Sequence, residues 1–461
     1  MKQEQLIGLC QRHNALLLEI DEARIRIAVP GDAPADLLAA LRFATQKRID
    51  IACWTPEEME KYRQRLSAPQ LAAVPQDSAT ATAFLDHTLQ QALTLRASDI
   101  HFEPGDSDFR IRLRVDGVLH ALPLVSPAMA KTLVARLKVL GNLDIAERRL
   151  PQDGQFTVTL GGKAISFRIA TLPCRYGEKV VLRLLHQVNQ ALDLSQLGML
   201  PDQLAQFQTA LSKPQGLLLV TGPTGSGKTV TLYSALQTRN HVEVNICSVE
   251  DPIEIPLAGL NQTQINPRAG LSFQSVLRAL LRQDPDIVMV GEIRDGETAE
   301  IAIKASQTGH LVLSTLHTNS TSETLTRIQQ MGVAPWMLAS ALSLVVAQRL
   351  VRKLCPHCRT KTQSDTLIPA SLWPSPLPQW QSTGCDQCYH GFYGRIALFE
   401  VLPMNKALRQ AIAAGATASD IQCKAREAGM TTLFESGCLA VEQGLTTQEE
   451  LLRVLGIPHA D

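Results

Sequence analysis

The residues of this sequence that most clearly could do chemistry lie at 222–229, where the pattern G-x-x-x-x-G-K-[ST] is matched. Glycines let such a loop turn its backbone N–H groups inward around phosphate oxygens, because no Cβ blocks the approach. The lysine at the end of the loop can reach the β- and γ-phosphates, and the following hydroxyl can bind Mg²⁺. The pattern predicts a site for a nucleoside triphosphate with Mg²⁺, formed by Gly222, Pro223, Thr224, Gly225, Ser226, Gly227, Lys228 and Thr229.

Polar residues also follow apolar runs at four places in residues 186–350. The runs 217–220, 244–249, 286–290 and 310–316 lead to Thr221, to Glu250 and Asp251, to Glu292, and to His317. Helix-compatible segments separate these runs, and this alternation is typical of an α/β fold whose mostly parallel sheet is covered on both faces. Ligands of such sheets bind at the carboxyl ends of the strands. We therefore expect these polar residues and the phosphate loop (residues 222–229) at one edge of one sheet.

This group of residues predicts hydrolysis of the triphosphate, because phosphoryl transfer to water depends on placing a water molecule and neutralising charge. Glu292 is the predicted water-polarising residue, since its strand is expected beside the strand that leads into the phosphate loop. Glu250 and Asp251 would hold Mg²⁺ through water or assist Glu292. Arg294 could pair with a carboxylate or with phosphate.

Further charged groups are candidates for contact with the γ-phosphate. His317 is a candidate sensor and His310 a weaker one, and the alternative for either ring is a structural hydrogen bond. Arg168 and Arg183 precede the nucleotide-binding segment. They would act as arginine fingers if their domain, from the same chain or a neighbouring one, folds over the nucleotide.

Four of the ten cysteines form two C-x₂-C pairs, Cys355 with Cys358 and Cys385 with Cys388. This spacing predicts a structural Zn²⁺ site with four thiolate ligands and no open position for catalysis. His357 is an outside candidate for a ligand. The other six cysteines are scattered singly, as is typical of reduced buried thiols.

The rest of the chain divides into further units. Residues 1–66 are expected to form a small α/β unit with strands at 15–20, 25–29 and 49–54 and a helix at 37–45. This unit would be either an adaptor or a structural cap. A linker at 67–82 precedes an α+β unit at 83–185. The nucleotide site occupies 186–350 and the cysteine insert 351–395. The tail at 396–461 is predicted to be helical, with a capping box at Thr447 and Glu450.

One strand of the unit at 83–185 carries an unusual charge pattern. Residues 109–115 alternate strictly between apolar side chains and arginines, which places Arg110, Arg112 and Arg114 on one face. That face is either simply solvated or a surface for acidic partners. Asp116 and Gly117 predict a hairpin turn after the strand.

Composition limits the class of protein. The 461 residues contain 44 Lys and Arg against 44 Asp and Glu, so the basic excess of proteins that coat nucleic acid is missing. No apolar run approaches the ~18 residues that a membrane helix needs. The run at 341–347, for example, ends at Gln348 and Arg349. Polar residues interrupt any secretory pattern at the N-terminus. We expect a soluble cytoplasmic protein that associates with membranes only through partners.

These motifs together resemble the assembly ATPases of type II secretion and type IV pili, from about residue 83 to the end. Besides the phosphate loop and the cysteine pairs, the resemblance rests on segments 98–101, 142–149, 150–154, 177–183, 250–251, 290–295, 309–319 and 429–433. The length most resembles that of the short enterobacterial pilus-operon members.

The resemblance implies a RecA-like ATPase core preceded by a PAS-like α+β domain, with ATP, Mg²⁺ and structural Zn²⁺ as cofactors. It implies that paired arginines of the preceding domain, matching Arg168 and Arg183, approach the γ-phosphate. It also implies a homo-hexameric ring on an inner-membrane platform protein, at the cytoplasmic face, where ATP turnover drives addition of pilin subunits. The cysteine insert favours the assembly branch over the related retraction motors.

Two other functions are compatible with a phosphate loop. A DNA-translocating ATPase would show DNA-stimulated activity with steep salt dependence, although the neutral charge balance argues against it. A nucleotide-binding scaffold with negligible turnover would release no phosphate at steady state.

Overall fold

The computed structural model describes residues 15–20, 24–31, 47–55, 81–123, 125, 127–185, 193–362 and 367–457, with the single positions 34, 36, 37, 41 and 59. Two compact units are present. The first comprises Met1–Val74, Cys355–Cys358 and Ser382–Phe392, and the second comprises the remainder. The predicted linker at 67–82, apart from its last two residues, and most of the predicted helix at 37–45 lie outside the described residues.

The N-terminal part forms the three strands that the sequence predicts. They are β1 (Leu16–Ile20), β2 (Arg24–Pro30) and β3 (Arg48–Trp54), in the order β1-β2-β3. β1 and β2 pair antiparallel, whereas β2 and β3 pair parallel. Alternate residues of β2 are buried together with Leu37 and Leu41, which gives this sheet a small core of its own.

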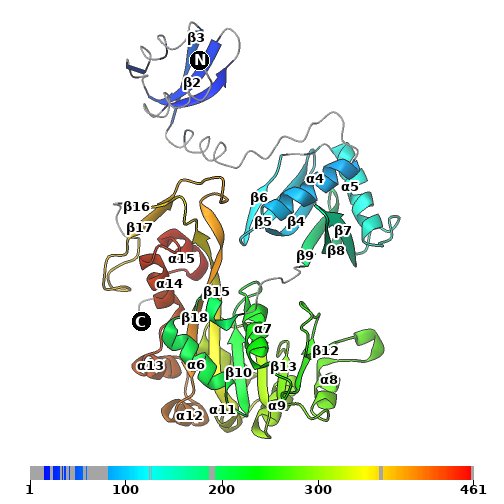
Figure 1. The fold of residues 1–461 in the computed structure, drawn as a ribbon, viewed down its shortest axis with the longest axis vertical. Helices are drawn as coiled ribbons and strands as arrows, with labels where there is room; N and C mark the ends of the chain where they lie inside the picture. Colours follow the sequence, from blue (N-terminus) through cyan, green and yellow to red (C-terminus); the bar gives the residue numbers. More distant parts are fainter. Residues whose placement is uncertain are drawn as a thin grey trace. The chain divides into compact units, whose positions relative to one another are not determined.

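Residues 81–185 form an α+β domain (Figure 1). Its two helices are α4 (Ala81–Thr94) and α5 (Pro127–Leu140). Its six-stranded sheet has the order β6-β5-β4-β9-β8-β7, and every pair is antiparallel. The strands are β4 (Ala97–Pro104), β5 (Phe109–Val115), β6 (Val118–Ala121), β7 (Gln152–Leu160), β8 (Lys163–Cys174) and β9 (Gly177–Leu185).

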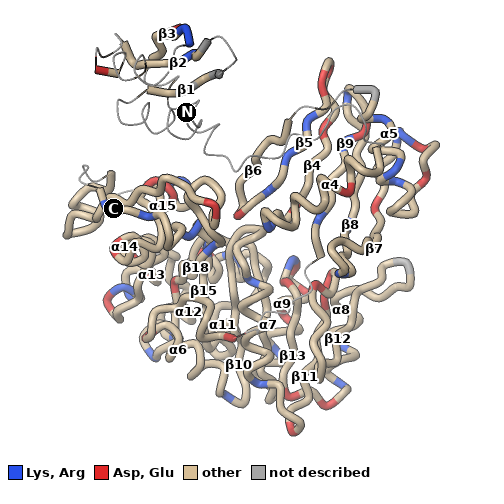
Figure 2. Tube along the Cα trace, turned by 45° about the horizontal axis from the view of Figure 1, so that its top comes forward, with Lys and Arg blue, Asp and Glu red and all other residues tan. Residues whose placement is uncertain are grey.

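The arginine-bearing face of β5 is largely neutralised within the domain. Arg112 donates to both carboxylate oxygens of Glu103, at 2.7 and 2.8 Å. Arg114 lies 3.8 Å from Asp99, while Arg110 is exposed. Figure 2 shows basic and acidic residues mixed along β4, β5 and β9. The face is therefore a mixed surface rather than an unbroken basic one.

The second sheet has seven strands in the order β12-β11-β13-β14-β10-β15-β18. The described pairs from β12 to β15 are parallel, which confirms the α/β prediction. Its strands are β10 (Gly216–Thr221), β11 (Ile246–Glu250), β12 (Asn261–Gln264), β13 (Ile287–Val290), β14 (Leu311–Leu316), β15 (Leu342–Leu354) and β18 (Phe392–Pro403). One expectation was wrong: β14, and not the strand before Glu292, lies beside β10.

Helices cover both faces of this sheet because successive apolar residues of its strands point to opposite sides. Leu218 and Val220 pack against α6 (Pro201–Leu211) and α7 (Lys228–Arg239). Leu217 and Leu219 belong to the opposite core. That core includes α8 (Phe273–Leu280), α9 (Gly296–Gln307), α10 (Thr321–Gln330), α11 (Pro335–Ala341), α12 (Lys406–Ala413) and α13 (Ala418–Glu427). Short 3₁₀ turns span Leu194–Gln196 and Pro267–Ala269.

The C-terminal part differs from the prediction at its start. Residues 396–403, predicted to be helical, belong to β18, whose apolar residues are buried beside β15. Helices α12, α13, α14 (Leu433–Glu442) and α15 (Gln448–Leu455) follow. In the sequence between β15 and β18, the strands β16 (Arg359–Thr362) and β17 (Gln379–Ser382) form a separate two-stranded sheet.

The predicted capping box of the last helix is only half formed. Thr447 Oγ1 accepts the backbone N–H of Glu450 at 3.1 Å. The Glu450 carboxylate instead accepts hydrogen bonds from Arg352 and Arg453, because it is buried and needs their charge. Among the helices formed by described residues, none is both long and apolar enough to cross a membrane.

Candidate active site

The phosphate loop joins the end of β10 to the start of α7. Gly222, Gly225 and Gly227 have φ values of 151°, 79° and 90°, a region in which a side chain is strained. A Cβ at Gly222 would lie 2.5 Å from the carbonyl oxygen of Gln348, so no larger residue fits there. The glycines therefore decide the shape of the loop, and Gly227 is also the N-cap of α7.

Lys228 is only 8 % exposed and lies folded back over the loop. Its Nζ donates to the carbonyl oxygens of Gly222 at 2.7 Å and Pro223 at 3.1 Å. The pKa of Lys228 is lowered to about 8, mainly by burial; the negative charge of Glu292 opposes this shift and the positive charge of Arg349 adds to it. Burial disfavours the charged form of this lysine, and an anionic ligand beside it would favour that form again.

The ends of neighbouring strands are hydrogen-bonded to one another beside this loop. Thr221, at the end of β10, shares a 2.6 Å hydrogen bond between its Oγ1 and that of Thr318, which follows β14. The Thr318 backbone N–H also donates to Thr221 Oγ1 at 2.9 Å. As predicted, the sheet thus brings the polar residues after β10 and β14 together.

Glu292 lies past the end of β13 with its side chain 16 % exposed. Arg294 donates to its Oε1, and Nε2 of His317 lies 3.3 Å from its Oε2. Burial alone would raise the pKa of Glu292, but the hydrogen bond and charge of Arg294, with His317, hold it below its ordinary value. The group is therefore an ionised carboxylate at neutral pH, able to accept a hydrogen bond from water.

Glu250 and Asp251 occupy different environments despite being adjacent. Glu250 is 4 % exposed, and its carboxylate accepts hydrogen bonds from Tyr233, from Ser248 at 2.6 Å and from Gln262 at 3.1 Å. Asp251 is exposed. The acceptor capacity of Glu250 is thus used largely within the protein, whereas Asp251 is accessible to solvent.

His310 lies at the amino end of β14, away from the edge that holds the phosphate loop. Its Nδ1 is 3.0 Å from the carbonyl oxygen of Ala305 in α9, and because a carbonyl only accepts, Nδ1 carries the hydrogen. His310 therefore makes a structural hydrogen bond, which was the alternative to a role as a phosphate sensor. His317 lies beside Glu292.

Sequence reasoning missed two residues at this edge, Gln348 and Arg349. They lie in β15, which pairs with β10 so that Ala347 is opposite Thr221. They are 2 % and 8 % exposed. A signal was available, because both follow an apolar run just as Glu250 and Glu292 do.

Arg168 and Arg183 are neighbours on the sheet of the α+β domain, since they are directly opposite in the β8–β9 register. Arg183 Nε donates to Asp99 at 2.8 Å, and Arg168 lies 3.8 Å from Asp153. Both side chains are more than half exposed, at 61 % and 52 %. Arg168, whose partner Asp153 is also exposed, could therefore exchange that carboxylate for another anion at small cost. Asp99 is buried, so release of Arg183 would leave Arg114 as the cation near it.

The four paired cysteines form a compact cluster, as their spacing predicts. Their sulfur atoms all lie within 4.8 Å of one another. The pairs Cys355–Cys385, Cys358–Cys388 and Cys385–Cys388 are each 3.7 Å apart. Tetrahedral Zn²⁺ with bonds of about 2.3 Å requires sulfur separations of about 3.8 Å. The cluster fits such an ion without His357.

The chain is similar in sequence to several known proteins. A family described as "Type II/IV secretion system protein" matches residues 75–453. The chain is 67% identical over 458 residues to "Protein transport protein HofB homolog" of Escherichia coli K12, covering 99% of both chains. It is 46% identical over 386 residues to "Type IV pilus assembly ATPase PilB" of Acinetobacter baylyi, covering 82% of this chain and 67% of that protein.

Among solved structures, the fold is similar to that of the pilus retraction motor PilT with bound ADP. The TM-score is 0.55 at 27% identity, covering 80% of this chain and 96% of that one.

Proposed function

The chain belongs to the family of type II/IV secretion system proteins, and on this premise we propose that it is an ATP hydrolase whose turnover powers assembly of type IV pilus or type II pseudopilus subunits. The observation that carries the proposal is the meeting of Lys228, Glu292 and His317 at one edge of the sheet. It is supported by the identity to a pilus assembly ATPase over 386 residues.

The phosphate loop would bind the triphosphate. Phosphate oxygens would replace the carbonyl groups that now accept hydrogen bonds from Lys228, and the N-terminus of α7 adds favourable partial charge. The Thr229 hydroxyl, which is exposed, would hold Mg²⁺, with Asp251 able to reach it through water. The ion would supply neutralisation of charge on the phosphates.

Glu292 would orient the attacking water. Its carboxylate is ionised and fixed from two sides, so it can accept a hydrogen bond from water without first moving. Glu250 would act through the hydrogen bond that it accepts from Tyr233 of α7 rather than on the water, because its oxygens already have partners. Arg168 and Arg183 would neutralise the γ-phosphate once their domain closes on a nucleotide, within a chain or between chains.

Steady-state phosphate release tests this proposal. The unaltered chain should hydrolyse ATP, and Glu292→Gln should still bind ATP while losing about 10²–10⁴-fold in turnover. Glu300→Gln is the matched control, because it makes the same change on the exposed face of α9, where the carboxylate pairs with Lys304. Near-normal turnover of Glu292→Gln would contradict the assignment, and DNA-stimulated turnover would favour a DNA translocase.

The assembly and partners follow from the same proposal. We expect a homo-hexamer that binds a polytopic platform protein at the cytoplasmic face of the inner membrane and reaches pilins only indirectly. Pull-down from detergent-solubilised membranes, with mass spectrometry, should recover a polytopic membrane protein with the unaltered chain. Recovery of soluble proteins alone would contradict the membrane-facing role.

The tetracysteine cluster would hold a structural Zn²⁺ ion, which supplies cross-linking of two loops and leaves no position for catalysis. Metal analysis should give about one Zn²⁺ per chain. Cys385→Ser should lose the ion, whereas Cys423→Ser, at an exposed cysteine outside the cluster, should keep it. A folded, unchelated preparation without zinc would remove this part of the proposal.

A further inference from the structure

The side chain of Gln348 packs directly against the phosphate loop. Its Oε1 accepts a hydrogen bond from Thr231 in the first turn of α7 at 2.7 Å. Its Nε2 would lie 2.8 Å from a Cβ at Gly227, and its backbone carbonyl closes the space beside Gly222. Gln348 thus touches both ends of the loop and the helix that the loop opens.

Arg349, the next residue, points to other partners. Its Nη2 donates to the backbone oxygen and to Oδ1 of Asn319, both at 3.1 Å. Its Nη1 donates to the Gln348 carbonyl at 3.0 Å. Arg349 makes no ion pair with a described residue, and burial lowers its pKa despite the attraction of Glu323 and Glu400. A buried cation bonded mainly to backbone oxygens holds the turn it contacts in one shape.

That turn, residues 317–321, carries His317 and is fixed from several strands. Thr221 of β10 binds Thr318. Glu400 of β18 accepts hydrogen bonds from the backbone N–H and hydroxyl of Thr321, at 2.9 and 2.6 Å. Arg349 supplies the contact from β15. The position of His317, and through it one contact of Glu292, therefore depends on the hydrogen bonds that join this turn to Thr221, Arg349 and Glu400.

We infer that Gln348 and Arg349 form a two-sided clamp in the middle of β15, in which Gln348 positions the phosphate loop and Arg349 positions the histidine turn. Both are positioning residues for the ATP hydrolysis proposed above, on which this inference rests. Because adjacent residues of a strand point to opposite faces, one strand can hold both halves of the site in register. The two residues should then affect different steps.

The expected effects separate along those lines. Gln348→Ala opens space beside Gly227 and leaves the Thr231 hydroxyl with only its 3.4 Å hydrogen bond to the Gly227 carbonyl oxygen, so ATP affinity should fall by about tenfold or more, with a smaller effect on turnover at saturation. Arg349→Gln loosens the turn while leaving the loop packed. It should lower turnover at saturating ATP by about 100-fold with little change in affinity, since a small misplacement of a reacting group is costly.

The experiment measures nucleotide affinity by fluorescence titration and turnover by phosphate release, on the full chain with Mg²⁺. Arg409→Gln is the matched control. Arg409 is also a partly buried arginine whose pKa is lowered by burial, and it also donates to backbone oxygens, those of Ala339 and Ser340. It lies at the amino edge of the sheet, so its variant should change neither quantity. Arg349→Lys keeps the positive charge near the turn, so its turnover should exceed that of Arg349→Gln.

The outcomes are distinguishable. A loss of affinity in Gln348→Ala with a loss of turnover alone in Arg349→Gln supports the clamp. Equal losses of both quantities in the two variants, or losses matched by Arg409→Gln, overturn it and indicate general destabilisation. Failure of the unaltered chain to bind or hydrolyse ATP would instead overturn the proposed function.

Discussion

The two edges of the seven-stranded sheet are built from the same strands and differ in what they offer a ligand. At the carboxyl edge, α7, α9 and α10 begin, and the partial positive charge of their N-termini lies near Lys228, Glu292 and the histidine turn. At the amino edge, helices end. The alternation of strand and helix alone therefore gives the two edges opposite partial charge.

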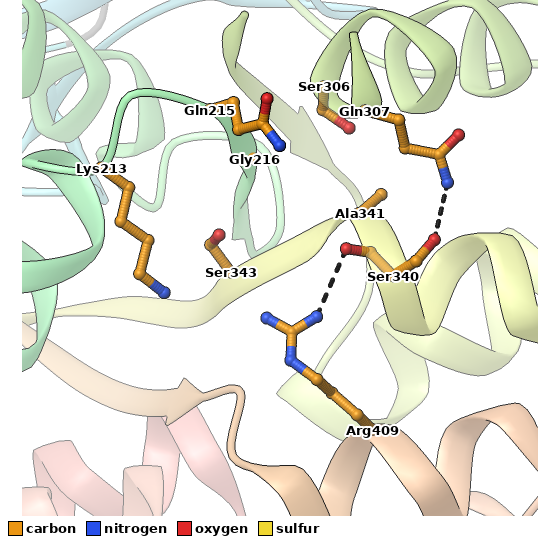
Figure 3. Close-up of a pocket in the computed structure, with 9 residues that line it drawn as sticks. All are labelled: Lys213, Gln215, Gly216, Ser306, Gln307, Ser340, Ala341, Ser343 and Arg409. Carbon is orange, nitrogen blue, oxygen red and sulfur yellow. Dashed lines mark hydrogen bonds between the residues drawn. The ribbon is translucent and has the colours of Figure 1, made fainter. Parts of the chain in front are cut away.

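The amino edge nevertheless contains a cavity of about 490 Å³, lined by Lys213 and Arg409 together with small polar residues (Figure 3). Lys213 and Arg409 have a role other than binding phosphate. The last turns of α6, α9 and α11 meet this cavity, and Arg409 donates to the Ala339 oxygen of α11 at 2.5 Å. Lysine and arginine at helix C-termini compensate the partial negative charge there. Positive side chains around a cavity thus identify a phosphate site only where helices begin.

The largest test of this contrast is a pair of lysines. Lys228→Ala should reduce ATP turnover by at least about 10³-fold, because residues 222–229 contain no other positively charged side chain to neutralise the phosphates. Lys213→Ala should leave turnover unchanged. Phosphate release under saturating ATP measures both, and thermal unfolding shows whether the variants remain folded.

The contrast fails if Lys213→Ala loses activity to a similar extent. Lys228→Ala should not lower the melting temperature, since removing a buried ammonium group relieves a desolvation cost.

A pair of glycines at the two ends of β10 gives the next largest effect. Gly216 and Gly222 have φ values of 133° and 151°, and an added Cβ would meet Ser343 at the first and Gln348 at the second. Alanine at either position should destabilise the chain by about 1–3 kcal/mol, measured by urea unfolding. Only Gly222→Ala should abolish nucleotide binding. Loss of binding in Gly216→Ala at temperatures where it is folded would show that the edges are coupled.

Much of the carboxyl edge could be predicted because apolar runs ended in polar residues. Thr221, Glu250, Glu292 and His317 all lie at or past strand ends for this reason. The order of the strands could not be predicted, since β13 and β14 are both buried along their whole length and their crossovers decide which one lies beside β10. That is why Glu292 was expected one strand too close to the loop.

The C-terminal differences have a tertiary cause. The run at 396–402 contains apolar residues on both faces and is compatible with either helix or strand, and hydrogen bonding to β15 decides in favour of β18. Glu400 interrupts that run as a buried carboxylate, and its hydrogen-bond partners are Thr321 and Leu433, which lie 79 and 33 residues away in the sequence. Contacts of that kind leave no local signal.

The pH dependence of ATP binding gives a smaller effect. Burial lowers the pKa of Lys228 from 10.5 to about 8, and phosphate must restore the proton. Affinity for ATP should therefore fall by up to about tenfold per pH unit above pH 8. Lys228→Arg should flatten this dependence because the guanidinium stays charged. Isothermal titration between about pH 7 and pH 9.5 measures both, and a flat profile for the unaltered chain would contradict the buried-lysine explanation.

The lowered pKa of Lys228 also affects the stability of the fold, which should rise with pH where ATP affinity falls. Between about pH 8 and pH 10.5 the unfolded chain binds a proton at Lys228 that the folded chain does not, so this residue's contribution to stability rises with pH across that window.

The smallest effect belongs to Arg409 at the amino edge. Arg409→Met keeps an apolar stem but removes the hydrogen bonds to the last turn of α11 and the charge that opposes its helix dipole. Stability should fall by about 0.3–1 kcal/mol, measured by urea unfolding, with ATP affinity unchanged. The loss should also shrink at high salt, because the charge at a helix terminus is screened there. A fall in ATP affinity instead would mean that the cavity at this edge communicates with the nucleotide site, and helix direction would no longer suffice to tell the two edges apart.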